Sequence, residues 1–164
     1  MPRPAAISAG LLLFRRTHGK LEVFLVHPGG PFWKNKDAGA WSIPKGLVGE
    51  GEEQLAAAVR EFQEETGFLP VGWASPTTAP DRFIPLGAVQ QKAGKLIHAW
   101  AFEGDADPAQ LKSNTTKIEL PRGSGRWLEI PEVDRAGWFT PEIARNKINP
   151  AQVEFIDRLK EDRL

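Results

Sequence analysis

Residues 46–68 read GLVGEGEEQLAAAVREFQEETGF, and this stretch decides how the rest of the chain is arranged. It predicts a glycine-rich loop that leads into a helix and stops at Gly67. Glu52 and Glu53 fall at the start of that helix, where the helix dipole favours negative charge. Gly67 falls where a left-handed cap is needed, because glycine adopts a positive φ without steric cost.

A helical wheel divides this helix into two faces. At about 100° per residue, the apolar side chains that fall within about 60° of one another predict the buried face; they are Leu55, Val59 and Phe62. Three carboxylates, those of Glu61, Glu64 and Glu65, span about another 100° beside that face. Ala57 and Ala58 lie one turn before them, so we expect little bulk between the carboxylates and whatever packs over them.

The acidic run has two interpretations when it is considered alone. Like charges four residues apart destabilise a helix by a few tenths of a kcal/mol, and a solvated surface face is the usual place for them. The glycine loop favours a second interpretation, since a backbone without side chains can approach a phosphate closely. Magnesium is commonly held by carboxylates together with substrate phosphates. Loop and helix together therefore predict a metal and phosphate site.

The spacing of this stretch resembles the signature box of the Nudix hydrolases at every defined position. Gly46 is followed after five residues by Glu52, and after seven more by residues 60–68, REFQEETGF. Seven positions of the box demand one residue type and two demand an apolar residue. At average usage, a chance match at one starting point is on the order of 10⁻⁹ to 10⁻⁸.

This resemblance implies an α+β fold, specifically an α/β/α sandwich with a mixed sheet, in which the box forms a loop–helix–loop. It also implies hydrolysis of a phosphoanhydride bond with Mg²⁺, or alternatively Mn²⁺, as cofactor. The implied metal ligands are Glu61, Glu64, Glu65 and the backbone carbonyl of Gly46. One of these carboxylates, or a carboxylate from a later loop, is expected to orient or deprotonate the attacking water.

Other residues are expected to support that site. Arg60 matches the box arginine that pairs with a neighbouring glutamate, and we predict Glu52 as its partner. Lys45 is a candidate phosphate contact, with an ordinary surface lysine as the alternative. Trp33 lies in a polar loop and is the candidate for stacking on a nucleobase, although tryptophans on strands mostly belong to the core. Glu119 is a candidate for an additional metal ligand, with a solvated glutamate as the more common alternative.

The rest of the chain predicts a sheet assembled from hairpins. Strands are expected at residues 7–14, 21–27, 86–91, 96–102 and 115–120, and a strand or the approach to a helix at 133–139. Extended chain is expected at residues 68–71 and turns at 75–82. Helices are expected after Thr140 and Asn149, since each is an N-cap type of residue followed by proline.

Length and composition restrict the class of protein. At 164 residues, the chain is expected to form one domain, residues 1–164, with a sizeable core. The 21 basic and 21 acidic residues balance, so we expect no nucleic-acid or membrane partner. The chain has no cysteine, signal pattern or apolar run of about 18 residues, and a cytoplasmic location is therefore expected.

We therefore expect a Mg²⁺-dependent pyrophosphohydrolase acting on a nucleoside triphosphate or a dinucleoside polyphosphate such as diadenosine tetraphosphate. Basic side chains at residues 32–40 and 113–126 would meet the polyphosphate. Dinucleoside tetraphosphatases commonly carry a tyrosine after the box, and this chain has none.

Three alternatives remain. A diphosphoinositol polyphosphate would demand a dense basic patch, which the balanced charge disfavours. RNA ends are disfavoured because no basic stretch with interleaved aromatic residues is present. A nucleotide-binding or sensor module without turnover is the alternative from another class. The intact carboxylates of the box favour the enzyme over the sensor.

Overall fold

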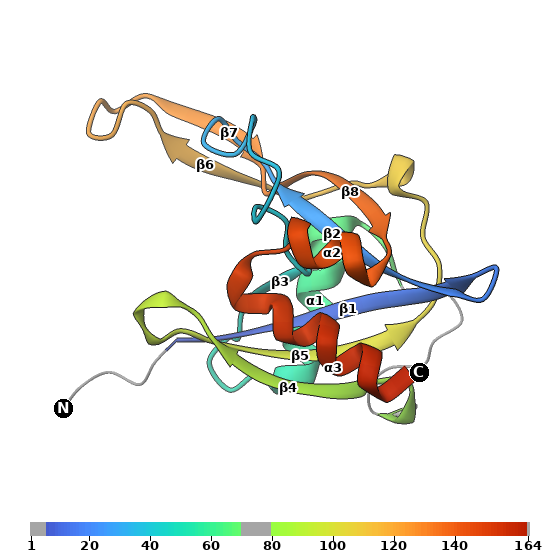
Figure 1. Ribbon diagram of the computed structural model, residues 1–164. Coiled ribbons are helices and arrows are strands. Elements are labelled where there is room, and N and C mark those ends of the chain that lie inside the picture. The colour runs from blue at the N-terminus through green and yellow to red at the C-terminus, as the bar shows by residue number, and fades with distance from the viewer. Residues whose placement is uncertain (1–5, 70–79, 164) are drawn as a thin grey trace.

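The computed structural model describes residues 6–69 and 80–163, and its largest element is a six-stranded sheet (Figure 1). The strands are β1 (Ile7–Thr17), β2 (Lys20–Pro28), β3 (Lys45–Leu47), β4 (Ile84–Gln90), β5 (Leu96–Glu103) and β8 (Val133–Phe139). They run in the order β4-β5-β1-β2-β8, and β3 pairs with β1 outside this path. The sheet is mixed, because β1 and β5 are parallel whereas the other neighbours are antiparallel.

β1 is the central strand because its apolar run, residues 9–14, is buried. One edge of β1 pairs with β5 along most of its length. The other edge pairs first with β3, where Ala9 lies opposite Gly46, and then with β2, where Phe14 lies opposite Val23. Gly10 permits this arrangement, since a Cβ there would lie 2.7 Å from the carbonyl oxygen of Pro44. The glycine loop of the box is thereby attached directly to the central strand.

Helices cover both faces of the sheet. They are α1 (Gln54–Thr66), α2 (Pro141–Lys147) and α3 (Val153–Arg163). Leu11 and Leu13 of β1 belong to a hydrophobic cluster with α1, whereas Leu12 and Phe14 belong to a second cluster with α2 and α3. Figure 1 shows α2 and α3 together on one side of the sheet and α1 on the other. The predicted α+β class and α/β/α sandwich are confirmed.

The box helix packs on the sheet through a stripe that differs from the predicted one. Ala57, Ala58 and Phe62 are almost fully buried, whereas Leu55 and Val59 are only partly buried. The two alanines were expected to leave space over the carboxylates, but they face the sheet instead. Small side chains let a helix approach a sheet closely, so the contact stripe runs through the two alanines as well as through the predicted Phe62.

The same stripe includes Glu61, which is 8% exposed. The prediction that all three box carboxylates lie beside the buried face is therefore wrong for Glu61. The expected helix end is confirmed: Gly67 has φ 77°, and its N–H donates to the Gln63 carbonyl oxygen over 2.8 Å.

The second half of the chain holds a two-stranded hairpin, β6 (Thr115–Glu119) and β7 (Trp127–Pro131), which projects from the sandwich in Figure 1. The sequence predicts β6 but no strand at residues 127–131. The side chains of Trp127 and Leu128 are largely exposed, so no burial pattern signals this strand.

The remaining predictions can be compared with the structure element by element. Both expected hairpins form, residues 133–139 are strand β8, and the helix after Thr140 is α2. The helix after Asn149 begins with a 3₁₀ turn and continues as α3. The 3₁₀ turns are Pro80–Arg82, Lys92–Gly94, Pro108–Gln110 and Pro150–Gln152. Most of the extended and turn segments expected at 68–71 and 75–82 lie outside the described residues. In the described part of the chain, no helix is long and apolar enough to cross a membrane.

Candidate active site

The strand β3 and the helix α1 bring the glycine loop against the buried carboxylate of the box. A Cβ on Gly46 would overlap the carboxyl group of Glu61, so any larger residue at this position would push that carboxyl group away. Glu61 therefore lies directly against the backbone of the loop. Burial raises the pKa of its carboxyl group, an effect that outweighs the opposing influence of Arg60.

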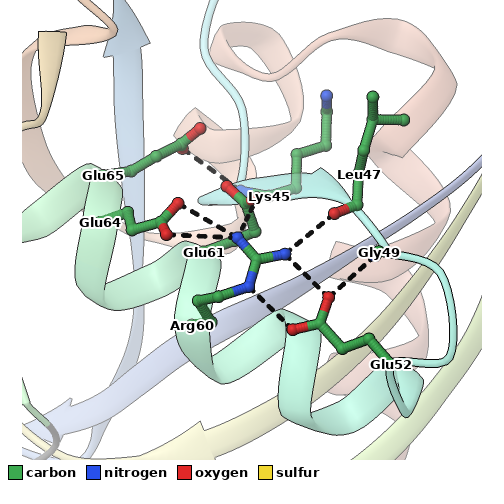
Figure 2. Close-up of polar contacts among 8 residues, drawn as sticks. All are labelled: Lys45, Leu47, Gly49, Glu52, Arg60, Glu61, Glu64 and Glu65. Carbon is green, nitrogen blue, oxygen red and sulfur yellow. Dashed lines mark hydrogen bonds and ion pairs between the residues drawn. The ribbon is translucent and has the colours of Figure 1, made fainter.

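Arg60 ties the loop to the helix (Figure 2). Its Nε donates to Glu52 Oε2 over 2.8 Å and its Nη2 donates to Glu52 Oε1 over 2.9 Å. Glu52 Oε1 also accepts the N–H of Gly49 over 2.9 Å, and Arg60 Nη2 reaches the Leu47 carbonyl oxygen over 3.0 Å. The predicted pair of Arg60 with Glu52 is confirmed. The hydrogen bonds from Arg60, together with that from Gly49, lower the pKa of Glu52 to about 2.

The same guanidinium continues toward the helix carboxylates. Arg60 Nη1 donates to Glu61 Oε1 over 2.8 Å and to Glu64 Oε2 over 3.2 Å. Figure 2 shows Arg60 between Glu52 on one side and these two carboxylates on the other. A rigid, planar fork of donors suits this role, because it fixes several carboxylates relative to one another.

Glu65 points toward β3, one turn after Glu61. Its Oε1 accepts the backbone N–H of Lys45 over 3.3 Å. Burial raises the pKa of Glu65 to about 8, and the nearby charges of Glu132 and Glu61 act in the same direction. A carboxylate in this position is costly to ionise unless a cation lies close to it.

Glu132 is a fourth carboxylate at this site that the sequence analysis did not identify. It follows β7, and burial and the charges of Glu61 and Glu64 raise its pKa. The expected later carboxylate, Glu119, lies elsewhere: it accepts the N–H groups of Gly123 and Gly125 in the turn of the hairpin. Since β7 is not predicted, no sequence signal places Glu132 beside α1.

A comparison with family models gives a match to the NUDIX domain over residues 4–159. The chain belongs to the NUDIX domain family. The family that the box at residues 46–68 indicated is thereby confirmed, and the match covers nearly the whole chain.

Proteins similar to this chain include two enzymes and one solved NUDIX domain. The RNA pyrophosphohydrolase of Rhizobium meliloti (strain 1021) is 30% identical over 80 residues, which cover 45% of this chain and 48% of that protein. The asymmetrical bis(5'-nucleosyl)-tetraphosphatase of Caenorhabditis elegans is 38% identical over 58 residues, which cover 35% of this chain and 38% of that protein. The NUDIX domain of Shewanella oneidensis NrtR, solved with ADP ribose, superposes with a TM-score of 0.64 at 15% identity and covers 99% of this chain and 90% of that chain.

These similarities differ in what they establish. The alignments with curated relatives span from 11% to 62% of those proteins' lengths, and the NrtR domain shares the fold alone. The match over residues 4–159 therefore establishes the family.

Nudix proteins generally use divalent metal cations, and the residues present fit such an ion. Four carboxylates converge where α1 meets β3 and the end of β7: Glu61, Glu64, Glu65 and Glu132. Hard divalent cations prefer oxygen ligands, and a bound cation would relieve the repulsion and desolvation that raise the pKa values of Glu61, Glu65 and Glu132. Within residues 6–69 and 80–163, no three acidic or histidine side chains already surround one point. In this arrangement Arg60 pairs with Glu61 and Glu64.

The two predicted substrate contacts lie on different elements. Lys45 is half-buried on β3, and Figure 2 shows its side chain directed away from Arg60. Trp33 lies on the loop between β2 and β3, is 38% exposed, and has Lys36 Nζ 5.2 Å from its ring centroid. The same loop borders the site, because the N–H of Gly29 donates to the Glu132 carbonyl oxygen over 3.0 Å.

Proposed function

We propose that this protein hydrolyses a phosphoanhydride bond in a nucleoside polyphosphate with Mg²⁺, which Mn²⁺ can replace. The substrate is a nucleoside triphosphate or a dinucleoside polyphosphate. The observation that carries the proposal is the group of four carboxylates at the junction of β3 and α1, fixed on one side by Arg60. A site of this composition suits a divalent cation together with the phosphates that it bridges.

The residues of the chain would divide the chemistry among them. Glu61, Glu64, Glu65 and the carbonyl oxygen of Gly46 would hold the cation, which neutralises phosphate charge when bound. Glu132 is our candidate for accepting the proton of the attacking water. Arg60 pairs with the carboxylates of Glu61 and Glu64 but not with that of Glu132. The water oxygen bonds to phosphorus, the bond to the bridging oxygen breaks, and the leaving phosphate departs with that oxygen.

Residues beside the site are our candidates for binding the substrate. Lys45 would contact a phosphate and Trp33 would stack on a base, because an exposed indole beside a lysine suits an aromatic, anionic ligand. The similarity to the C. elegans tetraphosphatase supports a dinucleoside polyphosphate. The similarity to the R. meliloti enzyme makes triphosphorylated RNA ends the second candidate substrate.

A binding module without turnover is the alternative from another class. The NrtR domain, solved with ADP ribose, supports it at the level of the fold. The presence of Glu61, Glu64 and Glu65 in the box favours turnover, since a sensor has no need of carboxylates that repel one another.

A substrate panel tests the proposal. Phosphate and nucleotide release is measured with Mg²⁺ and with Mn²⁺ on nucleoside triphosphates, diadenosine polyphosphates, ADP-ribose, a diphosphoinositol compound and 5′-triphosphorylated RNA. We expect a nucleoside polyphosphate to be hydrolysed fastest, and Glu64→Gln to lower its turnover by about 100-fold. Glu161→Gln, which alters an exposed carboxylate of α3, serves as the matched control. Nucleotide binding without release of any product would establish the sensor instead.

A further inference from the structure

The segment just before β6 crosses the end of α1. The N–H of Lys112 donates to the Thr66 carbonyl oxygen and the N–H of Asn114 donates to the Glu64 carbonyl oxygen, both over 2.9 Å. The last carbonyl groups of a helix lack partners within the helix, so this segment supplies them. Gly67 allows the crossing, since a Cβ there would lie 2.7 Å from the Lys112 carbonyl oxygen.

The two ends of the β6–β7 hairpin join at the same place. The N–H of Glu132 donates to the Asn114 carbonyl oxygen over 3.0 Å, and the N–H of Val133 donates to Ser113 Oγ over 3.0 Å. These four residues form what we call the neck of the hairpin. The neck therefore holds the backbone of Glu132 against the last turn of α1.

The side chain of Asn114 adds a contact that the backbone does not provide. Its amide nitrogen donates to the Glu64 carbonyl oxygen and to Glu132 Oε2, both over 3.2 Å. This orientation follows from the hydrogen-bond network, since the reverse one would set the amide oxygen against two acceptors. One side chain thus joins the carboxylate of Glu132 to the helix that carries the other three.

Glu132 needs such a partner because its neighbours repel it. The charges of Glu61 and Glu64 both act on its carboxylate, and a carboxylate free to rotate would turn away from them. An uncharged donor opposes this movement and leaves the carboxylate its negative charge. A lysine or arginine in the same place would neutralise that charge. Aspartate at position 114 would instead add a further negative charge against Glu132.

We infer that Asn114 is a positioning residue that holds the Glu132 carboxylate beside the carboxylates of α1. The inference rests on the proposed function, in which Glu132 handles the attacking water. Asn114 acts only through Glu132, so its removal has no further effect once Glu132 can no longer act.

A double-mutant cycle tests this coupling. Asn114→Ala is expected to lower kcat by about tenfold with little change in KM, as the loss of a hydrogen bond to a charged group predicts. In the Glu132→Gln background the same substitution is expected to change kcat by less than about twofold. Asn114→Asp is expected to lower kcat more than Asn114→Ala does. Equal losses from Asn114→Ala in both backgrounds would overturn the inference.

A matched control separates positioning from simple stability. Ser113→Ala removes the bond to the Val133 N–H in the same neck but leaves the Asn114 amide and Glu132 side chain intact. It is expected to keep kcat within about twofold of the unaltered protein. A loss in Ser113→Ala equal to that in Asn114→Ala would show that only the integrity of the neck matters. Thermal unfolding of each variant confirms that it folds.

Binding of Mn²⁺, followed by electron paramagnetic resonance, provides a readout that needs no turnover. Asn114→Ala is expected to weaken Mn²⁺ binding several-fold, and again only when Glu132 is present. Suppose that Mn²⁺ binding depends on Asn114 only when Glu132 is present, but nothing on the panel is hydrolysed. This result would refute the proposed function and support the coupling between Asn114 and Glu132. Unchanged Mn²⁺ affinity together with unchanged kcat overturns the positioning role. A protein that neither binds Mn²⁺ nor turns over overturns both.

Discussion

At Arg60, one guanidinium contacts Glu52 on one side and Glu61 and Glu64 on the other. It bonds Glu52 with two nitrogen atoms and reaches Glu61 and Glu64 with a third. The contacts with Glu61 and Glu64 join close neighbours on one helix, whereas the pair with Glu52 spans eight residues and depends on how the loop meets the helix. Arg60 therefore acts as a fixed spacer among groups that repel each other.

Arg60→Lys tests this role at the level of one residue. Lysine keeps the charge but loses the fork, so we expect kcat/KM to fall by about 10- to 100-fold. The free energy of unfolding should change by less than about 1 kcal/mol, because the Arg60 side chain is 38% exposed and surface ion pairs contribute little. Arg145→Lys, at an exposed pair with Asp157, should change neither quantity. Full activity in Arg60→Lys would contradict the role of the fork.

The stability of the metal-free protein should depend on pH through Glu65. The pKa of Glu65 is raised to about 8 from an ordinary value of 4.5, so between these values the folded state binds more protons than the unfolded chain. Stability should therefore fall as pH rises through this range, and the raised pKa values of Glu61 and Glu132 act in the same direction. Glu52 acts oppositely, but only below about pH 4.5, where its stabilising pair with Arg60 is lost.

Urea unfolding in a chelator at pH 5 and pH 8 measures this dependence. Glu65→Gln should flatten it and should be more stable than the unaltered protein at pH 8 by about 1–3 kcal/mol. Added Mg²⁺ should raise the stability of the unaltered protein at pH 8, since it binds the folded state. A rise in metal-free stability from pH 5 to pH 8 would show that Glu65 ionises readily without a cation.

At the scale of elements, the contact between β3 and α1 determines the site. β3 is only three residues long, yet it pairs with the central strand and sets Gly46 against Glu61. The helix presents its alanines to the sheet, which brings the carboxylates on this side close to the loop.

Gly46→Ala should disrupt this contact. The added Cβ would displace Glu61, so we expect a loss of about 100-fold or more in kcat/KM and of about 1–3 kcal/mol in the free energy of unfolding. Gly19→Ala provides the control, because its φ of 77° is strained but nothing lies within 4 Å of the added Cβ. It should cost about 1 kcal/mol of stability and leave activity unchanged. Kinetics and urea unfolding of both variants distinguish misplacement of Glu61 from general strain.

At the scale of the whole molecule, stability and function come from different parts. The sandwich has two hydrophobic clusters, one on each face of the sheet. The β6–β7 hairpin projects from it and exposes Trp127 and Leu128. The hairpin therefore adds little to the core, but its neck places Glu132 beside the carboxylates of α1.

A pair of substitutions tests this division. Leu12→Ala, in the fully buried centre of β1, should lower the free energy of unfolding by about 2–5 kcal/mol. Trp127→Ser, where 63% of the side chain is exposed, should change it by less than about 0.5 kcal/mol. Urea unfolding measures both. A large loss in Trp127→Ser would mean that the hairpin is part of the stabilising structure.

The sequence by itself determined the parts that depend on local spacing. The helix ending at Gly67, the two hairpins, the pair of Arg60 with Glu52 and the family all follow from residues near one another in the chain. The cap needs a positive φ, and the pair needs the chain to turn back over a few residues. Local stereochemistry specifies the cap, whereas the pair was expected from the resemblance to the Nudix box.

Only the tertiary structure decided which distant residues complete the site. It placed Glu61 on the buried stripe of α1, because Ala57, Ala58 and Phe62 face the sheet while Leu55 and Val59 are only partly buried. It also brought Glu132 and Asn114 to the end of α1 through the neck of a hairpin whose second strand has no burial pattern. Contacts of this kind depend on strand register and close packing between remote segments, and hydrophobic periodicity carries no information about either.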